Sequence, residues 1–231
     1  MTFISKRMKK MTEGLDKAKL YTIPEALNML KEKSTVKFDE TIDIAMNLGI
    51  DTKQSDQNIR GMVSLPNGTG KKCVVAVFAK GPKATEAKEA GADIVGDDDL
   101  VANILKGQIN FDRCIATPDM MAVLGKVAKI LGPKGLMPNP KLGTVTMDVK
   151  GAVEKAKAGQ VEYRAEKSGV VHAGLGKLSF GTEKLEENVR AFIDVIQKAK
   201  PASSKGTYIK AVTLSSTQGV GLRIDLSDLK K

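Results

Sequence analysis

The sequence predicts a mixed α/β and α+β protein of two domains, one of which is inserted into the other. The middle of the chain alternates short apolar runs with helical segments, which is typical of a parallel sheet. Both flanks contain strands that alternate apolar and polar residues, together with one principal amphipathic helix. A flank of roughly 70 residues is marginal for a core of its own. We therefore expect residues 1–68 plus 160–231 to form a discontinuous two-layer α+β domain, and residues 69–159 to form an inserted Rossmann-like domain, joined by a hinge.

The N-terminal flank predicts a helix followed by two paired strands. Thr22 and Glu25 have the spacing of a capping box at the start of "IPEALNMLKEK", with Pro24 in the first turn. The basic residues 1–12 before this helix look like a loose arm. "ETIDIAMNLG" then has the period-two pattern of a half-buried strand, and "NIRGMVSL" is its expected partner. The apolar face of that first strand consists of Ile42, Ile44, Met46 and Leu48.

The inserted region predicts three parallel strands and the helices between them. The strands are "KKCVVAVFA", "ADIVG" and "RCIAT", and the helices are "KATEAKEAGA" and "DDDLVANILKG". Thr117 is expected to cap the next helix, "MMAVLGKVAKIL", with Pro118 at its first position. A short strand, "TVTM", and a last helix, "VKGAVEKAKAG", complete the region.

The C-terminal flank predicts a hairpin, a long helix and two further strands. "QVEYRA" and "GVVHAGL" are expected to form the hairpin, turned at "EKSG". "TEKLEENVRAFIDVIQKAK" is a helix that stops before Pro201. "TYIKAVTLSS" and "VGLRIDL" supply the last strands. The apolar face of the helix consists of Leu185, Val189, Phe192, Ile193 and Ile196.

One loop in the inserted region is unusually stiff and basic. Residues 130–145, "ILGPKGLMPNPKLGTV", contain three prolines, three glycines and two lysines without an acid. Proline limits the conformations of the unfolded loop, so Lys134 and Lys141 can meet a partner at little ordering cost. Leu136 and Met137 have two alternatives, which are to tuck back under the loop or to face the partner.

Charge points to a polyanionic partner. The net charge is +10 and the isoelectric point is near 9.5, and residues 120–147 and 195–224 contain lysine or arginine but no acid. The alternative is a solvated surface of uneven charge. An aromatic content of 4% with no tryptophan disfavours a base-stacking platform, so we expect recognition of RNA by shape. A DNA-binding regulator and a nucleotide-dependent enzyme are the competing classes.

The sequence is poor in catalytic groups. A single histidine, His172, disfavours metal sites and histidine relays, and "LPNGTGKKC" lacks the first glycine of a phosphate-binding loop. Cys73 and Cys114 are expected to be buried, reduced thiols. No apolar run approaches the roughly 20 residues of a membrane span, and the N-terminus lacks the apolar centre of a secretion signal. We expect a cytoplasmic protein with no cofactor, no metal, no enzymatic activity and no membrane partner.

Four segments resemble a known family when they are taken together and in order. They are "KFDETIDIAMNLGID", "ILGPKGLMPNPK", "GQVEYRAEKSGVVHAGLGKLSF" and "SSTQGVG", and they resemble the family of the bacterial large-subunit ribosomal protein one. The resemblance spans nearly the whole chain. It implies a monomer within the large ribosomal subunit whose discontinuous domain binds the rRNA stalk helices and forms the mobile stalk at the tRNA exit site. It further implies assisted release of deacylated tRNA from that site, and repression of the protein's own operon mRNA.

The resemblance also implies which residues bind rRNA. Lys37 would meet a phosphate, Phe38 would pack against a sugar or base, and Thr41 and Thr217 would donate to backbone or 2′-hydroxyl oxygens. The full set of expected rRNA contacts is Lys37, Phe38, Glu40, Thr41, Lys167, Ser168, Gly169, His172, Ser216, Thr217, Gln218 and Gly219.

Three positions in this set carry a qualification. Phe38 shares the phase of Ile42, so periodicity alone also allows a core position, and Glu40 has the alternative role of orienting Lys37. The family usually has methionine where this chain has Gln218, which exchanges packing for a hydrogen bond. In the inserted region, Lys134 and Lys141 are expected to make a second contact with RNA or tRNA.

Overall fold

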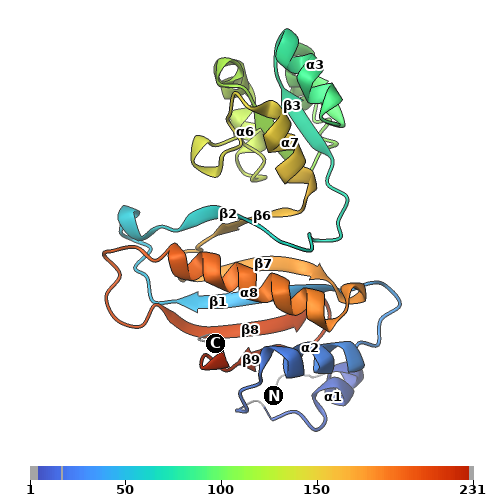
Figure 1. Cartoon of the computed structure of the whole chain (residues 1–231), viewed down its shortest axis with the longest axis vertical. Coiled ribbons are helices and arrows are strands. Elements are labelled where there is room, and N and C mark those ends of the chain that lie inside the picture. The colour runs from blue at the N-terminus through green and yellow to red at the C-terminus, as the bar shows by residue number, and fades with distance from the viewer. Residues whose placement is uncertain (1–4, 17, 229–231) are drawn as a thin grey trace. The chain divides into compact units, whose positions relative to one another are not determined.

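The chain divides into two compact units in a computed structural model that describes residues 5–16 and 18–228 (Figure 1). Unit 1 consists of residues 1–70 and 161–231, and unit 2 consists of residues 71–160. Both units mix helices and strands, so the protein belongs to the α and β class that its sequence predicts. The first unit combines the two ends of the chain, whereas the second is continuous.

The main sheet of unit 1 has four antiparallel strands in the order β7-β1-β8-β9. Ile42 of β1 lies opposite Gly176 of β7 and opposite Ser216 of β8. The long strand that the alternating pattern predicts is therefore central, with a partner on each edge. The strands are β1 (Thr41–Leu48), β7 (Val170–Lys177), β8 (Ile209–Ser216) and β9 (Leu222–Ile224).

Two predicted strand pairings are wrong. "NIRGMVSL" forms β2 (Arg60–Ser64), but β2 pairs with β6 (Gln160–Arg164) because both edges of β1 are already occupied. The chain does turn tightly at "EKSG", where the Glu166 amide donates to the Val170 carbonyl at 2.9 Å. The strands on either side of this turn nevertheless share only the bridge between Ala165 and Val171, since β6 and β7 belong to different sheets.

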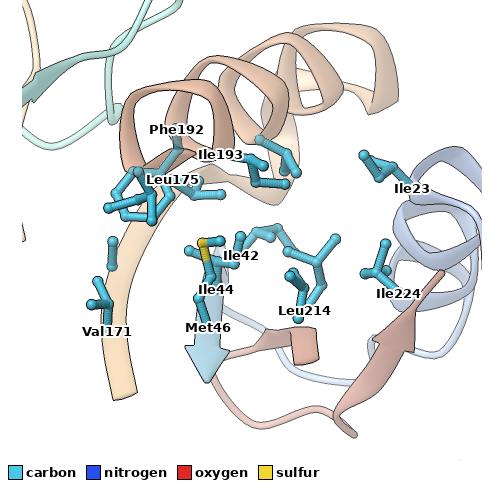
Figure 2. Close-up of a cluster of buried hydrophobic side chains, with 14 of the residues drawn as sticks. Ile23, Ile42, Ile44, Met46, Val171, Leu175, Phe192, Ile193, Leu214 and Ile224 are labelled. Carbon is cyan, nitrogen blue, oxygen red and sulfur yellow. The ribbon is translucent and has the colours of Figure 1, made fainter. Parts of the chain in front are cut away.

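Two long helices cover one face of the four-stranded sheet. They are α2 (Ile23–Glu32) and α8 (Thr182–Lys198), which contact each other as well as the strands (Figure 1). The predicted apolar faces of β1 and α8 are both buried in this core, which confirms the two periodicities. Figure 2 shows residues from the strands, α2 and α8 meeting in it: Ile23, Ile42, Ile44, Met46, Val171, Leu175, Phe192, Ile193, Leu214 and Ile224.

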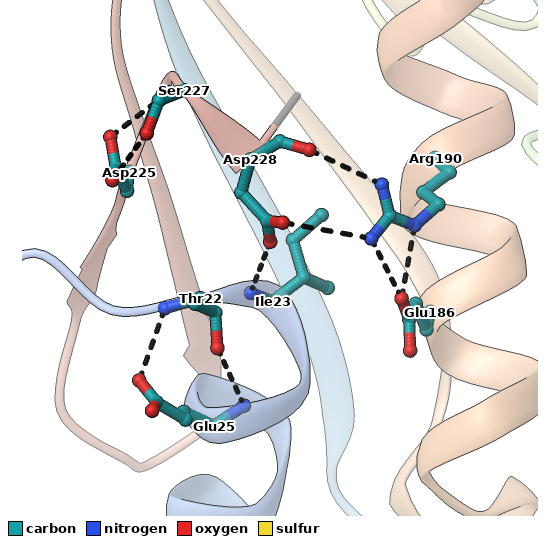
Figure 3. Close-up of polar contacts among 8 residues, drawn as sticks. All are labelled: Thr22, Ile23, Glu25, Glu186, Arg190, Asp225, Ser227 and Asp228. Carbon is teal, nitrogen blue, oxygen red and sulfur yellow. Dashed lines mark hydrogen bonds and ion pairs between the residues drawn. The ribbon is translucent and has the colours of Figure 1, made fainter. Parts of the chain in front are cut away.

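A polar network fixes the start of α2 against α8 (Figure 3). The predicted capping box is present, since Thr22 and Glu25 each accept from the other's backbone amide. Asp228 accepts a hydrogen bond from the Ile23 amide at 3.2 Å and lies 3.9 Å from the Arg190 guanidinium of α8. The C-terminal segment thus ties the two helices together.

A further helix, α1 (Lys6–Thr12), precedes α2, so the expectation of a loose arm is wrong for residues 6–12. Residues 1–4 lie outside the described part of the chain. Ser5 caps the helix by accepting from the Met8 amide at 3.3 Å, and the Met11 side chain is buried in the core of unit 1. Met8 also packs against this core, so two methionines within a basic segment anchor the helix.

Unit 2 contains a three-stranded parallel sheet in the order β4-β3-β5, with helices on both faces. One apolar cluster lies between the sheet and α4, α5 and α6, and a second lies between the sheet and α3 and α7. This coverage explains why all four residues of β3 are buried. The elements are β3 (Val75–Phe78), α3 (Pro82–Glu89), β4 (Ile94–Gly96), α4 (Asp98–Leu105), β5 (Arg113–Ala116), α5 (Met121–Leu124), α6 (Ala128–Leu131) and α7 (Val149–Lys157).

The predicted helix over residues 120–131 is broken into short pieces. Two four-residue α-helical segments, α5 and α6, alternate with 3₁₀ turns at Pro118–Met120 and Gly125–Val127. Thr117 does not cap this segment, because its hydroxyl is directed at the Phe78 carbonyl at 3.5 Å. The expected strand "TVTM" is reduced to one bridge between Val145 and Ala116.

Candidate nucleic-acid interface

Two segments of the predicted site meet where β1 begins and β8 ends. The Thr217 amide donates to the Thr41 carbonyl at 3.1 Å, which extends the β1–β8 ladder by one bond. The Thr217 hydroxyl accepts from the Thr41 amide at 2.9 Å and lies 3.3 Å from the Thr41 carbonyl. Residues 37–41 and 216–219, which are far apart in the sequence, therefore form one surface, which we call the loop edge.

Glu40 is the buried support of the loop edge. Only 1% of its surface is exposed, and its carboxylate accepts from the Ser34 hydroxyl at 2.7 Å and from the Gln218 amide at 2.9 Å. Charged groups are buried only when hydrogen bonds compensate the lost hydration, and these two bonds supply that compensation. Glu40 was expected either to contact RNA or to orient Lys37, and the structure instead places its carboxylate under Gln218.

A lysine closes the loop edge on the side of β7. The Lys177 ammonium donates to the Thr41 hydroxyl at 2.9 Å and to the Asp39 carbonyl at 3.2 Å. Asp39 in turn accepts from the Ser179 hydroxyl at 2.7 Å. These bonds hold the entry to β1 in one conformation and leave a positive charge beside it.

Lys37 and Phe38 stand on the exposed side of the loop edge. Phe38 is 49% exposed, so the alternative core position is wrong. The alternation that would bury it applies only from Thr41, where β1 begins. An exposed aromatic ring beside an exposed lysine is the combination that stacks on a base or sugar while the lysine meets a phosphate.

Ser216 and Gly219 shape the loop edge from inside. Ser216 is 4% exposed, and its hydroxyl has no hydrogen-bond partner among the described residues. A methyl group added at Gly219 would lie 2.1 Å from that hydroxyl, which only glycine avoids. Ser216 was expected to contact rRNA, but its burial makes it part of the support.

The remaining predicted contacts lie at the other end of β1. Lys167, Ser168 and Gly169 form the turn before β7, where the Leu48 amide donates to the Gly169 carbonyl at 2.9 Å. Gly169 has a φ of +76°, and its backbone is buried against Leu48. Seven residues of extended chain separate Thr41 from Leu48, or roughly 23 Å. The predicted site is therefore two patches at opposite ends of one strand.

His172 lies between the two patches, on the sheet face that α2 and α8 leave uncovered. It is opposite Ala45 in the register, and its Nε2 is 3.9 Å from a carboxylate oxygen of Glu166. Asp43 on the same face has a raised pKa because burial disfavours its charge, and nearby Lys177 and His172 only partly offset this.

The uncovered face is a feature that sequence reasoning did not assign to the site. The outward positions of β8 and β9 carry Thr213, Ser215 and Arg223, which are partly or fully exposed. The alternating pattern of these strands indicates which residues face outward, because the outward residues alternate with the buried ones. The face carries polar and charged side chains, and it connects the two patches.

The basic loop of unit 2 is held from within. Leu136 and Met137 pack against the core of unit 2, which decides between the two alternatives in favour of tucking back. The Asn139 amide donates to the Thr144 hydroxyl at 2.8 Å, and the Asn139 side chain accepts from the Lys141 amide at 2.9 Å. Lys134 and Lys141 are exposed, and neither forms a salt bridge within the part of the chain that the structure describes.

The described residues bear on three further features, which are a metal-binding cluster, paired or reactive cysteines and a membrane-spanning helix. No group of three His, Cys, Asp or Glu side chains is placed to hold a metal ion there. Both cysteines are free, and burial raises the pKa of the Cys114 thiol, whereas Cys73 is partly exposed. Among the helices described, none has both the length and the apolar character that crossing a bilayer requires.

A known protein family matches most of the chain. The model of the ribosomal protein L1p/L10e family matches residues 30–220, which include the loop edge, the turn before β7 and all of unit 2. Residues 1–29, which include α1 and most of α2, and the segment from Gly221 onward lie outside the match. The family consists of structural proteins of the large ribosomal subunit that bind rRNA, and it is not a family of enzymes. The chain belongs to the ribosomal protein L1p/L10e family.

Proposed function

We propose that unit 1 binds the stalk helices of large-subunit rRNA through the loop edge, the uncovered sheet face and the turn before β7. The observation that carries the proposal is the joining of residues 37–41 to residues 216–219 by Glu40 and Thr217. This arrangement leaves Lys37, Phe38 and Gln218 exposed on one surface. A rigid edge of this kind suits a structured RNA, whose backbone must be met at fixed positions.

The contacts would read RNA shape more than sequence. Lys37 would bind a phosphate and Phe38 a sugar or base, while the second patch would bind a further stretch of backbone through Lys167 and Ser168. Two patches roughly 23 Å apart require a partner that spans the sheet. An RNA helix with its loops meets that requirement.

The wider role follows from family membership and charge. We propose that the protein forms the mobile stalk at the tRNA exit site as a monomer within the subunit, and that it assists release of deacylated tRNA. In this proposal unit 2 is a Rossmann-like insert that presents Lys134 and Lys141 to RNA or tRNA. We also propose that unit 1 represses translation of its own operon by binding an mRNA site that mimics the rRNA site.

The test compares RNA and DNA binding by the full chain. The protein should remain with large ribosomal subunits after a high-salt wash, and it should bind a transcript of the rRNA stalk helices far more tightly than duplex DNA of equal length. A Lys37→Gln, Phe38→Ala variant should lose most of this preference, whereas Lys106→Gln, Leu105→Ala, a matched exposed pair in unit 2, should retain it. Equal binding to duplex DNA would support a DNA-binding regulator instead.

A further inference from the structure

We propose that helix α1 takes part in RNA recognition, because its Arg7 holds the Gln218 side chain with the amide nitrogen facing the partner. Arg7 is then a positioning residue, and Gln218 is the hydrogen-bond donor that touches RNA. The inference rests on the proposed rRNA-binding function and deepens it. It adds an element that lies outside the residues matched by the family.

Arg7 donates two hydrogen bonds to Gln218. Its Nη1 donates to Gln218 Oε1 at 2.6 Å, and its Nη2 donates to the Gln218 main-chain carbonyl at 2.9 Å. The main-chain N–H of Gln218 donates to the carboxylate of buried Glu40 at 2.9 Å. Both the backbone and the side chain of Gln218 are therefore fixed, although the residue is exposed.

The hydrogen bond to Oε1 decides which way the carboxamide points. Because the oxygen faces Arg7, the Nε2 group and its two N–H donors face away from it. Nε2 has no hydrogen-bond partner among the described residues. An exposed, oriented pair of donors at the loop edge suits an acceptor on RNA, which is a phosphate oxygen, a 2′-hydroxyl or a base carbonyl.

Arg7 can act in this way because α1 is anchored. Met11 is buried in the core of unit 1, and the Lys33 ammonium of the following segment donates to the carbonyls of Met11 at 3.0 Å and Glu13 at 2.8 Å. A fixed helix lowers the entropy that Arg7 loses when it holds Gln218.

The surroundings of Arg7 also favour an anion. A cleft of about 400 Å³ beside it is lined by residues that include no acid. The lining residues are Lys6, Arg7, Lys10, Met11, Lys33 and Thr35.

The experiment measures the dissociation constant of the full chain for a transcript of the rRNA stalk helices over a range of salt. Arg7→Ala should weaken binding about five- to tenfold, the size expected for losing partly exposed charged hydrogen bonds. Lys9→Ala removes one exposed cation from the same helix and should change binding less than about twofold, as for an exposed charge without a fixed partner.

Two readouts separate positioning from a direct phosphate contact. If Arg7 acts through Gln218, Arg7→Ala leaves the slope of log affinity against log salt unchanged. Arg7→Lys cannot form both hydrogen bonds to Gln218, so it should bind RNA nearly as weakly as Arg7→Ala. A direct contact would flatten the slope by about 0.7 to 0.9 and would be largely restored by Arg7→Lys. That second pattern would overturn the positioning role.

A double-mutant cycle tests whether the effect passes through Gln218. Gln218→Ala should weaken binding at least as much as Arg7→Ala, and adding Arg7→Ala to it should cost little more. Fully additive losses would overturn the inference, as would an unchanged dissociation constant for Arg7→Ala. Failure of the wild-type chain to bind the transcript would overturn the proposed function as well, so the two failures are distinguishable.

Discussion

At the scale of single residues, Thr217 joins β8 to β1 through its hydroxyl. Replacing it with valine keeps the shape but leaves the Thr41 amide without its acceptor. We expect Thr217→Val to weaken rRNA binding by about 1 to 3 kcal/mol, while the free energy of unfolding falls by about 1 kcal/mol or less, because this bond is exposed. Thr85→Val, which removes an exposed hydroxyl hydrogen bond in unit 2, is the matched control and should leave rRNA binding unchanged. Isothermal titration and urea unfolding would measure both, and equal binding by the Thr217 variant would refute the role.

Asp43 should make stability depend on pH in an unusual direction for a carboxylate. Burial raises its pKa in the folded protein above the ordinary value of 3.8, so folding favours the protonated form. The contribution of Asp43 to stability is largest below pH 3.8 and is lost as pH rises through its folded pKa. Asp43→Asn should therefore stabilise the protein at pH 7, with a benefit that shrinks as pH falls toward 3.8. Urea unfolding of both proteins between pH 3.5 and 7 measures this, and a pH-independent difference would contradict it.

The exposure or burial of the candidate site residues could be predicted from sequence only in part. The exposure of Phe38 could not be inferred, because periodicity does not say at which residue a strand begins. The burial of Ser216 follows the alternation of β8, in which Val212 and Leu214 are also buried, whereas the burial of Glu40 depends on Gln218 from the far end of the chain. Arg7 was missed because a short basic segment gives no sign that its methionines anchor it to the core.

At the scale of elements, the loop between β8 and β9 depends on a fit between Gly219 and Ser216. A methyl group at Gly219 would approach the Ser216 hydroxyl to 2.1 Å, so Gly219→Ala should destabilise the loop and weaken rRNA binding. Ser216→Ala removes that oxygen, which has no partner among the described residues, and should be neutral or stabilising.

The double variant is the informative one. With Ser216→Ala present, the methyl group of Gly219→Ala would be 3.3 Å from the Cβ of residue 216, so much of the lost stability and binding should return. Thermal unfolding and RNA titration of the three variants would show this. If the double variant is as impaired as Gly219→Ala alone, the clash is not the cause.

Helices and strands were more predictable than their pairings. The alternation of β1 and the apolar face of α8 each report burial by one neighbouring layer, which is a local property of the sequence. The partner of β2 depends on which strands have already taken the edges of β1, and no local pattern records that. The prediction of one helix over residues 120–131 is wrong for a related reason. Short helical segments bring its apolar residues to the core of unit 2 as well as one continuous helix would.

At the scale of the whole molecule, Lys134 and Lys141 should serve the assembled ribosome and not the isolated stalk RNA. Replacing both with glutamine should leave binding to the stalk transcript and its salt dependence unchanged. For large subunits carrying exit-site tRNA, the slope of log affinity against log salt should flatten by about 1.4 to 1.8, the value for two lost phosphate contacts. Lys126→Gln with Lys129→Gln is the matched control from the same acid-free stretch. Identical slopes in both settings would mean that the two loop lysines are only solvated.

The division of unit 1 between the two ends of the chain also sets the order in which the protein takes shape during its synthesis. Unit 2 is continuous and complete once residue 160 has been added, whereas β1 still lacks both neighbours, β7 and β8. At about 5–20 residues per second, the nascent chain waits roughly 4–14 s for residues 161–231. Until β7 and then β8 have been added, Ile42, Ile44 and Met46 lack their neighbouring strands, so the nascent chain exposes an apolar strand to which a chaperone at the ribosome can bind.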